Sequence, residues 1–269
     1  MVKVLILSGY GINCEAETAN AFTLAGGSPT IVHINDLITG KEKMSDYQIL
    51  VFPGGFSYGD DTGAGNAYAN KIKNNLWEDI KQFIADEKLI IGICNGFQIM
   101  TEIGLFPLEG MEYGDEVNFL LPNTTNRYIC RWTNLKENNS KCVFTKGIEK
   151  VFIPVAHGEG RFFCSEETLA KLKANNQIVF TYCDKDGNAA EGVEPINPNG
   201  SFADIAAICD KTGRVMGMMP HPERALYSFN RPDYHLISEL ARRDGTEIKD
   251  IDEFNFRIFK NAVEFFKQP

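Results

Sequence analysis

Residues 89–100, LIIGICNGFQIM, join an unbroken apolar run to a Gly-x-Cys-x-Gly turn and then to a segment of helical character. The mostly β-branched residues 89–93 are typical of a strand buried on both faces, as in a parallel sheet. Gly92 and Gly96 flank Cys94 at the spacing of a nucleophile elbow, a strand-to-helix turn so tight that a Cβ at either glycine would clash. This stretch therefore predicts an α/β protein with a parallel sheet.

The elbow also predicts a chemical role for Cys94. The free N–H groups at the start of a helix attract negative charge, which suits a nucleophilic sulfur. The backbone N–H of Asn95 would point toward an oxyanion formed when that sulfur attacks a carbonyl. The alternative is a buried structural cysteine, because free cysteines are often buried and the chain has seven.

Length and composition limit the possible classes of protein. The chain has 269 residues, of which 43% are hydrophobic, and no Pro/Gly/Ser-rich linker, so we expect one domain over residues 1–269. The net charge of -9 argues against binding to nucleic acid or to an anionic membrane. Without a signal peptide or a long apolar segment, a cytoplasmic location is expected. The cysteines form no C-x-x-C pair, so neither a disulfide framework nor a metal site is predicted.

Periodicity and turn residues predict the order of elements. Asn13 is expected to cap the first helix and Gly26-Gly27 to end it. Strands are predicted at residues 2–7, 30–34, 48–52, 89–93, 151–155, 178–183, 205–209 and 215–219, and further helices at 76–85 and 252–267.

The loop that follows the third predicted strand is rich in glycine. Residues 53–60 read PGGFSYGD, and a loop of this kind at the carboxyl end of a strand lets the backbone approach a ligand closely. An ordinary turn is the alternative interpretation.

Residues 219–224, MPHPER, supply a second candidate constellation. A cysteine nucleophile needs a neighbouring base, and the base needs a third group that holds its tautomer. His221 and Glu223, two residues apart around Pro222, could fill these roles, although such a pair is also common on protein surfaces. Of the other histidines, His157 is the only serious competitor for the base.

Six segments together resemble a known family. They are PGGFSYGD (53–60), GICNGFQ (92–98), NTTNRYICRW (123–132), IPVAHGEGRF (153–162), NPNGS (197–201) and MPHPER (219–224). In this order they resemble the class I, triad-type glutamine amidotransferases, and specifically the glutaminase subunits of phosphoribosylformylglycinamidine synthase. The resemblance implies a flavodoxin-like fold, with an open, mostly parallel sheet and helices on both faces. It ends near Arg224, and residues 229–269 are expected to form a C-terminal helical extension.

The resemblance also implies roles for individual residues. It puts the nucleophile on Cys94, the general base on His221 and the orienting carboxylate on Glu223. The oxyanion hole corresponds to the backbone N–H groups of Gly55 and Asn95. The substrate-binding positions correspond to Gly54, Phe56 and Gln98. Residues 61–65 depart from the pattern of separate subunits and resemble the version fused into single-chain synthases, which leaves the mode of assembly open.

The implied reaction is hydrolysis of L-glutamine to glutamate and ammonia through a thioester. The ammonia would pass to a synthase partner that converts formylglycinamide ribonucleotide to formylglycinamidine ribonucleotide in purine biosynthesis. No cofactor or metal is expected in this chain, and ATP and magnesium are expected in the partner, because no phosphate-binding G-x-x-x-x-G-K-[ST] loop is present.

Other functions stay open at this point. The chain could be the glutaminase subunit of another amidotransferase, or a Cys-elbow hydrolase or chaperone of the same architecture. A catalytically silent interaction subunit is a third possibility, which the presence of all three catalytic residue types disfavours.

Overall fold

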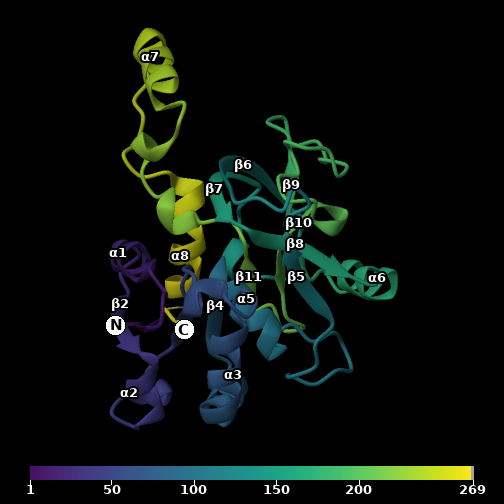
Figure 1. The fold of residues 1–269 in the computed structure, drawn as a ribbon. Coiled ribbons are helices and arrows are strands. Elements are labelled where there is room, and N and C mark those ends of the chain that lie inside the picture. The colour runs from purple at the N-terminus through teal and green to yellow at the C-terminus, as the bar shows by residue number, and fades with distance from the viewer. Residues whose placement is uncertain (268–269) are drawn as a thin grey trace.

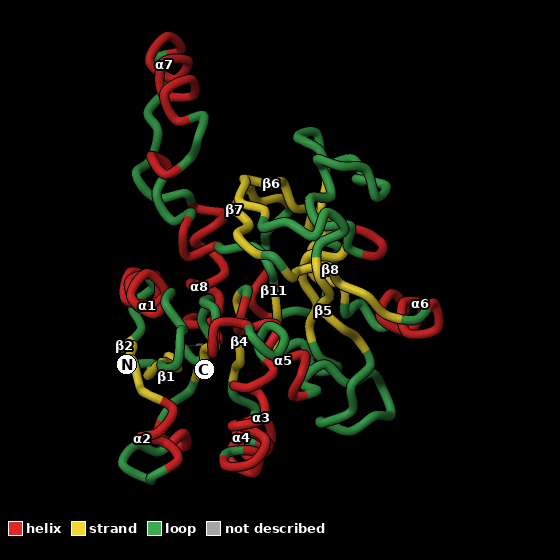
Figure 2. The backbone as a smooth tube through the Cα atoms, in the orientation of Figure 1, coloured by secondary structure: helices red, strands yellow, loops and turns green. Residues whose placement is uncertain are grey.

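The computed structural model describes residues 1–267 and has one main sheet beside a small two-stranded one (Figures 1 and 2). The nine strands of the main sheet lie in the order β2-β1-β3-β4-β11-β10-β9-β6-β7. In chain order they are β1 (Lys3–Ser8), β2 (Ser28–His33), β3 (Ile49–Phe52), β4 (Leu89–Ile93), β6 (Ile129–Glu137), β7 (Lys150–His157), β9 (Ile178–Cys183), β10 (Ile205–Cys209) and β11 (Val215–Met218).

Strands β2, β1, β3, β4 and β11 are parallel to one another. β3, β4 and β11 are buried along their whole length, which explains why their sequences are apolar without alternation. The helices of this half are α1 (Glu15–Leu24), α2 (Ile34–Ile38), α3 (Asn66–Asn75), α4 (Trp77–Ala85) and α5 (Asn95–Ile103).

The strand order fixes where these helices lie. From β1 the chain moves through α1 to β2 on one side, whereas from β3 it moves through α3 and α4 to β4 in the opposite direction. Because such crossovers are almost always right-handed, the two directions place their helices on opposite faces of the sheet. The predicted α/β architecture with helices on both faces is therefore confirmed.

The other half of the main sheet is antiparallel, from β11 through β10, β9 and β6 to β7. Strands β5 (Asn118–Pro122) and β8 (Glu159–Cys164) form the small antiparallel sheet, and α6 (Glu166–Ala174) follows β8. Short 3-10 helices occupy Met44–Asp46, Ser57–Asp60, Val143–Thr145, Phe202–Asp204, Pro222–Arg224 and Ser228–Asn230.

Several elements differ from the sequence prediction. The N-cap of α1 is Cys14 and not Asn13, because the backbone N–H groups of both residues bond to the Gly54 carbonyl and delay the start of the helix. Helices α3 and α6 and strand β8 were not predicted. Lysine and asparagine dominate α3 and weaken its apolar pattern. β8 begins with a glycine between two charged residues, and its two phenylalanines are adjacent, so it lacks the alternation that marks a strand.

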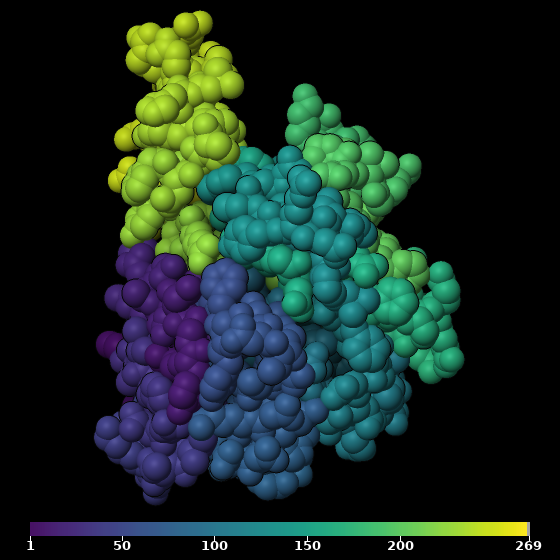
Figure 3. Space-filling model, viewed as in Figure 1, coloured from purple at the N-terminus to yellow at the C-terminus, as the bar shows by residue number. Residues whose placement is uncertain are grey.

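The chain after Arg224 contains two helices with different surroundings. α8 (Glu253–Phe265) buries Ile258, Phe259 and Val263, and the Phe259 ring meets the Phe22 ring of α1 edge to face at 5.2 Å. α7 (Tyr234–Asp244) has no buried residue and projects from the body of the protein (Figures 1 and 3). The predicted extension, 229–269, also includes residues 268–269, which lie outside the described part. No helix among residues 1–267 has the length and apolar character needed to cross a membrane.

Candidate active site

The candidate site lies where the carboxyl ends of four parallel strands meet. β2 and β3 lie on opposite sides of β1, so the strand order reverses direction there, and such a point opens a crevice outside the strand ends in α/β sheets. The loops after β1 and β3 enter this crevice. Cys94 directly follows β4, and His221 lies three residues after β11.

The elbow at Cys94 has the predicted geometry. Cys94 adopts the strained angles φ 52° and ψ -109° and is the N-cap of α5. A Cβ at Gly96 would collide with the Phe52 carbonyl of β3, and one at Gly92 would lie 2.8 Å from Gly96 backbone atoms. The Cys94 N–H donates to the Met218 carbonyl at 2.8 Å, so the turn is joined to β11, which leads to His221.

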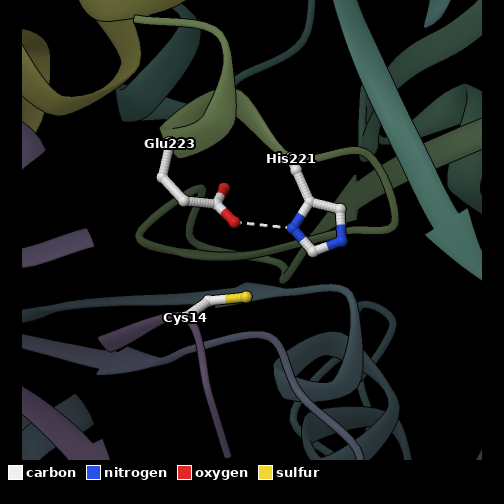
Figure 4. Close-up of side chains that lie close together, drawn as sticks. All are labelled: Cys14, His221 and Glu223. Carbon is white, nitrogen blue, oxygen red and sulfur yellow. Dashed lines mark hydrogen bonds and ion pairs between the residues drawn. The ribbon is translucent and has the colours of Figure 1, made fainter. Parts of the chain in front are cut away.

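His221 and Glu223 form a buried pair. His221 Nδ1 lies 2.6 Å from Glu223 Oε1, and the two residues are only 1% and 3% exposed (Figure 4). Burial alone would lower the pKa of His221, but the Glu223 carboxylate and then the Cys94 thiol raise it, so that the pKa lies well above its ordinary value. The His221 N–H donates to the Pro154 carbonyl at 2.8 Å, which fixes the backbone of the histidine.

His157, the competing candidate for the base, has different surroundings. Its Nδ1 lies 3.1 Å from the amide oxygen of Asn123, which carries no charge. Burial and then the nearby His221 lower the pKa of His157 to about 3, so its ring stays neutral. The geometry therefore favours His221 as the base, because only His221 has a carboxylate partner.

The loop after β3 is held by the loop after β1. The N–H groups of Asn13 and Cys14 both donate to the Gly54 carbonyl at 3.1 Å, and Ile12 pairs with Gly55 in an isolated bridge. A Cβ at Gly55 would lie 2.6 Å from the Ile12 Cα, so this close approach of two backbones requires glycine. These contacts set the position of the predicted oxyanion donor at Gly55.

Asn95 and Gln98 join the elbow helix to its surroundings. The Asn95 side chain is buried, accepts from the Ser57 N–H at 3.0 Å and donates to Gln98 Oε1 at 2.8 Å. Gln98 in turn donates to the Glu159 carbonyl. Asn95 is the first residue of α5, where backbone N–H groups have no partner within the helix. Its N–H is thus available to an oxyanion.

Phe56 and Gly54 differ in exposure. Phe56 is 39% exposed and its ring lies 6.1 Å from the ring of Tyr128, whereas a Cβ at Gly54 would lie 2.9 Å from the His221 ring and 3.0 Å from the Cys14 sulfur. Gly54 therefore lines the interior beside the base, and Phe56 lies at the surface.

Sequence reasoning missed three polar residues at the site. The thiol of Cys14 lies beside the His221–Glu223 pair, and Arg224 Nη2 donates to its sulfur at 2.8 Å. Asp60 lies 3.4 Å from Asn95 Nδ2, and burial followed by the charge of Glu159 raises the pKa of Asp60 to about 6. The sequence offers a signal for Arg224 alone, because it directly follows Glu223. Cys14 and Asp60 reach the site from distant segments of the chain, which no local pattern indicates.

The segments HGEGRF and NPNGS lie against each other. Asn199 Nδ2 donates to the Gly160 carbonyl at 2.7 Å, and the Phe162 N–H donates to Ser201 Oγ at 3.0 Å. Asn199 and Ser201 are buried. Ala156 directly precedes the first of these motifs, and its carbonyl lies 3.6 Å from Cys94 Sγ.

Comparison with known proteins agrees with this geometry. Residues 1–266 match the model of the family described as the CobB/CobQ-like glutamine amidotransferase domain. Phosphoribosylformylglycinamidine synthase subunit PurQ of Methanococcus maripaludis is 62% identical over 266 residues, which cover 99% of this chain and 98% of that relative. The subunit of the same name from Dehalococcoides mccartyi is 43% identical over 268 residues, with 99% and 98% covered.

A solved structure is also similar. In the structure of PurLQS from Thermotoga maritima, one chain is 28% identical to this chain with a TM-score of 0.71, and the match covers 98% of this chain and 99% of that one. The elbow, the buried His–Glu pair and these matches over nearly the whole length lead to one conclusion. The chain belongs to the CobB/CobQ-like glutamine amidotransferase family and, within it, to the phosphoribosylformylglycinamidine synthase subunits PurQ.

Proposed function

We propose that this chain hydrolyses L-glutamine to glutamate and ammonia at Cys94 and delivers the ammonia to a synthase partner. The observation that carries the proposal is the buried His221–Glu223 pair beside a cysteine on a strained elbow. A structural cysteine would need neither the strained φ of 52° nor a histidine–carboxylate pair at its side.

The first half of the reaction forms a glutamyl thioester. His221 accepts the Cys94 thiol proton, and the sulfur attacks the side-chain carboxamide carbon of glutamine. The protonated ring then donates that proton to the departing nitrogen, so that ammonia leaves as the C–N bond breaks. Glu223 stabilises the charged ring and holds its proton at Nδ1.

The second half hydrolyses the thioester. Water attacks the same carbonyl carbon while His221 accepts a proton from it, and glutamate leaves as the thiol is restored. In both halves the carbonyl oxygen becomes negatively charged, and the N–H groups of Gly55 and Asn95 are the proposed donors to it. Gln98, Gly54 and Phe56 are the proposed contacts of the rest of the glutamine molecule.

Relatives support the proposed partner and product. The relatives named above are subunits of phosphoribosylformylglycinamidine synthase, and the similar solved structure is that of PurLQS. The proposed acceptor of ammonia is therefore formylglycinamide ribonucleotide, bound with ATP and magnesium on a separate synthase subunit. Ammonia that escapes into water becomes protonated to ammonium and is lost to the synthase. We therefore expect glutamine hydrolysis to be slow until the partner has bound its own substrates.

The loop pairing at Gly55 offers a means of coupling. Misplacing one oxyanion donor slows acyl transfer by about 100-fold or more, so a small shift of this loop is enough to switch turnover. The partner must bind the aligned loop better than the misaligned one, since only such a difference shifts the population.

The test is glutamine turnover by the purified chain alone and after addition of the synthase subunit, ATP, magnesium and formylglycinamide ribonucleotide. We expect slow turnover alone, faster turnover in the complete mixture, and formylglycinamidine ribonucleotide as a product. Cys94→Ser is the control, and it should yield product only when ammonia is supplied. No glutamine hydrolysis in either mixture would overturn the proposal.

A further inference from the structure

We propose that Cys14, His221 and Glu223 form a binding site for a zinc-type divalent ion, and that an ion held there blocks the base. Cys14 is the N-cap of α1, His221 is the N-cap of the 3-10 helix Pro222–Arg224, and Glu223 lies within that helix. Sulfur, imidazole nitrogen and carboxylate oxygen together form a ligand set that suits Zn²⁺ rather than Mg²⁺ or Ca²⁺.

The distances allow such an ion after a small adjustment. One ligand atom from each residue lies within 4.8 Å of the other two. Tetrahedral zinc with bonds of about 2.0–2.3 Å holds its ligand atoms about 3.3–3.6 Å apart. The sulfur therefore has at most about 1.5 Å to move inward, from the 4.8 Å limit to about 3.3 Å, while Nδ1 and Oε1, now 2.6 Å apart, must separate by about 1 Å or less. In Figure 4 the Cys14 sulfur lies below the dashed line that joins the Glu223 carboxylate to the His221 ring.

Burial and an unused ligand atom support the same site. All three side chains are buried, so an ion would be shielded from water on most sides. Glu223 Oε2 is buried and has no hydrogen-bond partner among the described residues, which leaves a second carboxylate oxygen free to bind the ion. The backbone of Cys14 is fixed through its N–H to Gly54 and through its carbonyl, which accepts from Thr18 Oγ1 at 2.6 Å.

Arg224 is the group that an ion would have to displace. Its Nη2 donates to the Cys14 sulfur, and its Nε lies 3.9 Å from Glu223 Oε1. The guanidinium is the exposed edge of the cluster, with 36% of the side chain accessible, so it can swing outward and open a path for the ion. Because it competes as a cation, its removal should strengthen metal binding.

Metal binding and base catalysis exclude each other at this site. The ion would take the place of the proton between Nδ1 and Oε1 and would release the thiol proton of Cys14 to solvent. His221 would then hold no proton at Nδ1 for Glu223 to stabilise, and its ring could not turn toward Cys94. The affinity of the site for the divalent ion should also increase as the pH rises, because protons compete with the ion for the same ligand atoms.

The test uses Co²⁺ as a spectroscopic probe in a Cys94→Ala background, which removes the catalytic thiol. We expect one equivalent of Co²⁺ to bind and to show thiolate-to-metal absorption. Adding Cys14→Ser should abolish that absorption, whereas adding Cys164→Ser should leave it unchanged, because Cys164 is a buried cysteine of β8 that is not one of the three proposed ligands. Adding Arg224→Gln should make Co²⁺ bind more tightly.

A second readout is independent of the probe. In the otherwise unchanged chain, Zn²⁺ should inhibit glutamine turnover reversibly, with activity restored by a chelator. Cys14→Ser should need at least about tenfold more Zn²⁺ for the same fractional inhibition. If Cys14→Ser does not fold, Glu223→Gln in the Cys94→Ala background replaces it, with weaker Co²⁺ binding expected.

Two results would overturn the site. One is thiolate absorption that persists in Cys14→Ser, and the other is its absence from Cys94→Ala, which would mean that no metal binds through Cys14. The absorption does not depend on turnover, so failure of the proposed glutaminase reaction would leave this test intact.

Discussion

Glu223 Oε1 approaches His221 Nδ1 to 2.6 Å within an interior that water hardly reaches. In such surroundings a charged ring without its carboxylate would be strongly disfavoured, which is why the pKa of His221 depends on this pairing. The carboxylate also leaves Nε2 as the ring atom available for proton transfer, since Nδ1 is occupied.

The first prediction separates the two members of that pair. His221→Ala should lower kcat by about 10⁴-fold because both proton transfers are lost, whereas Glu223→Gln should lower it less, by about 10²–10³-fold, since the imidazole remains. Steady-state glutamine turnover at saturating substrate is the measurement. His157→Gln is the matched control, and an equally severe loss there in a folded protein would place the base at His157.

A second prediction concerns the nucleophile. Cys94→Ala and Cys94→Ser should both abolish glutamine hydrolysis without changing the circular dichroism spectrum. An electrophilic glutamine analogue should add its mass to the peptide that contains Cys94. Exposed Cys130 serves as the control, because Cys130→Ser should leave both turnover and labelling intact. Labelling at Cys14 with Cys94 unmodified would contradict the assignment.

The oxyanion loop gives a third prediction. Gly55→Ala should lower kcat by about 100-fold or more, because the added Cβ would press on the backbone of Ile12 and shift the donor. Gly187→Ala is the control: its φ of +88° is also positive, but an added Cβ there would meet nothing within 4 Å, so turnover should stay normal. A Gly55→Ala protein with unchanged kcat would mean that this N–H does not bind the oxyanion.

The fourth prediction uses pH. Burial and Glu159 raise the pKa of Asp60 to about 6, from an ordinary value near 3.8, so the folded protein holds this proton more tightly than the unfolded chain. The contribution of Asp60 to stability is therefore favourable below pH 3.8 and is lost as the pH rises through 6. Asp60→Asn, which resembles the protonated form, should raise Tm at pH 7 more than at pH 4. Asp186→Asn, on an exposed turn, should show no such difference.

The fifth prediction tests the role of α8. Phe259→Ala should lower the free energy of unfolding by about 3–5 kcal/mol, because it empties a core position that the Phe22 ring contacts. Phe254→Ala on the same helix removes a side chain that is 51% exposed and should cost far less. Urea unfolding followed by circular dichroism measures both, and similar costs would show that α8 is not part of the core.

Much of the fold was readable because its signals are local. An apolar strand followed by glycines on both sides of Cys94 restricts the backbone whatever surrounds it, and β4 and α5 have the predicted form. The prediction failed for Asn13, where hydrogen bonds to the distant Gly54 carbonyl delay the helix, and it missed α3, whose lysines and asparagines weaken its apolar pattern.

The sequence by itself determined the elbow, the glycine-rich loop and a histidine two residues from a glutamate, because each depends on neighbours in the chain. Only the tertiary structure decided that His221 rather than His157 meets a carboxylate, and that Cys14 and Arg224 lie beside it. These choices depend on which strand ends come together. The order of β1, β3, β4 and β11 in the sheet brings segments more than 200 residues apart into contact. The Arg224–Cys14 hydrogen bond, for example, joins residues separated by 210 positions in the sequence.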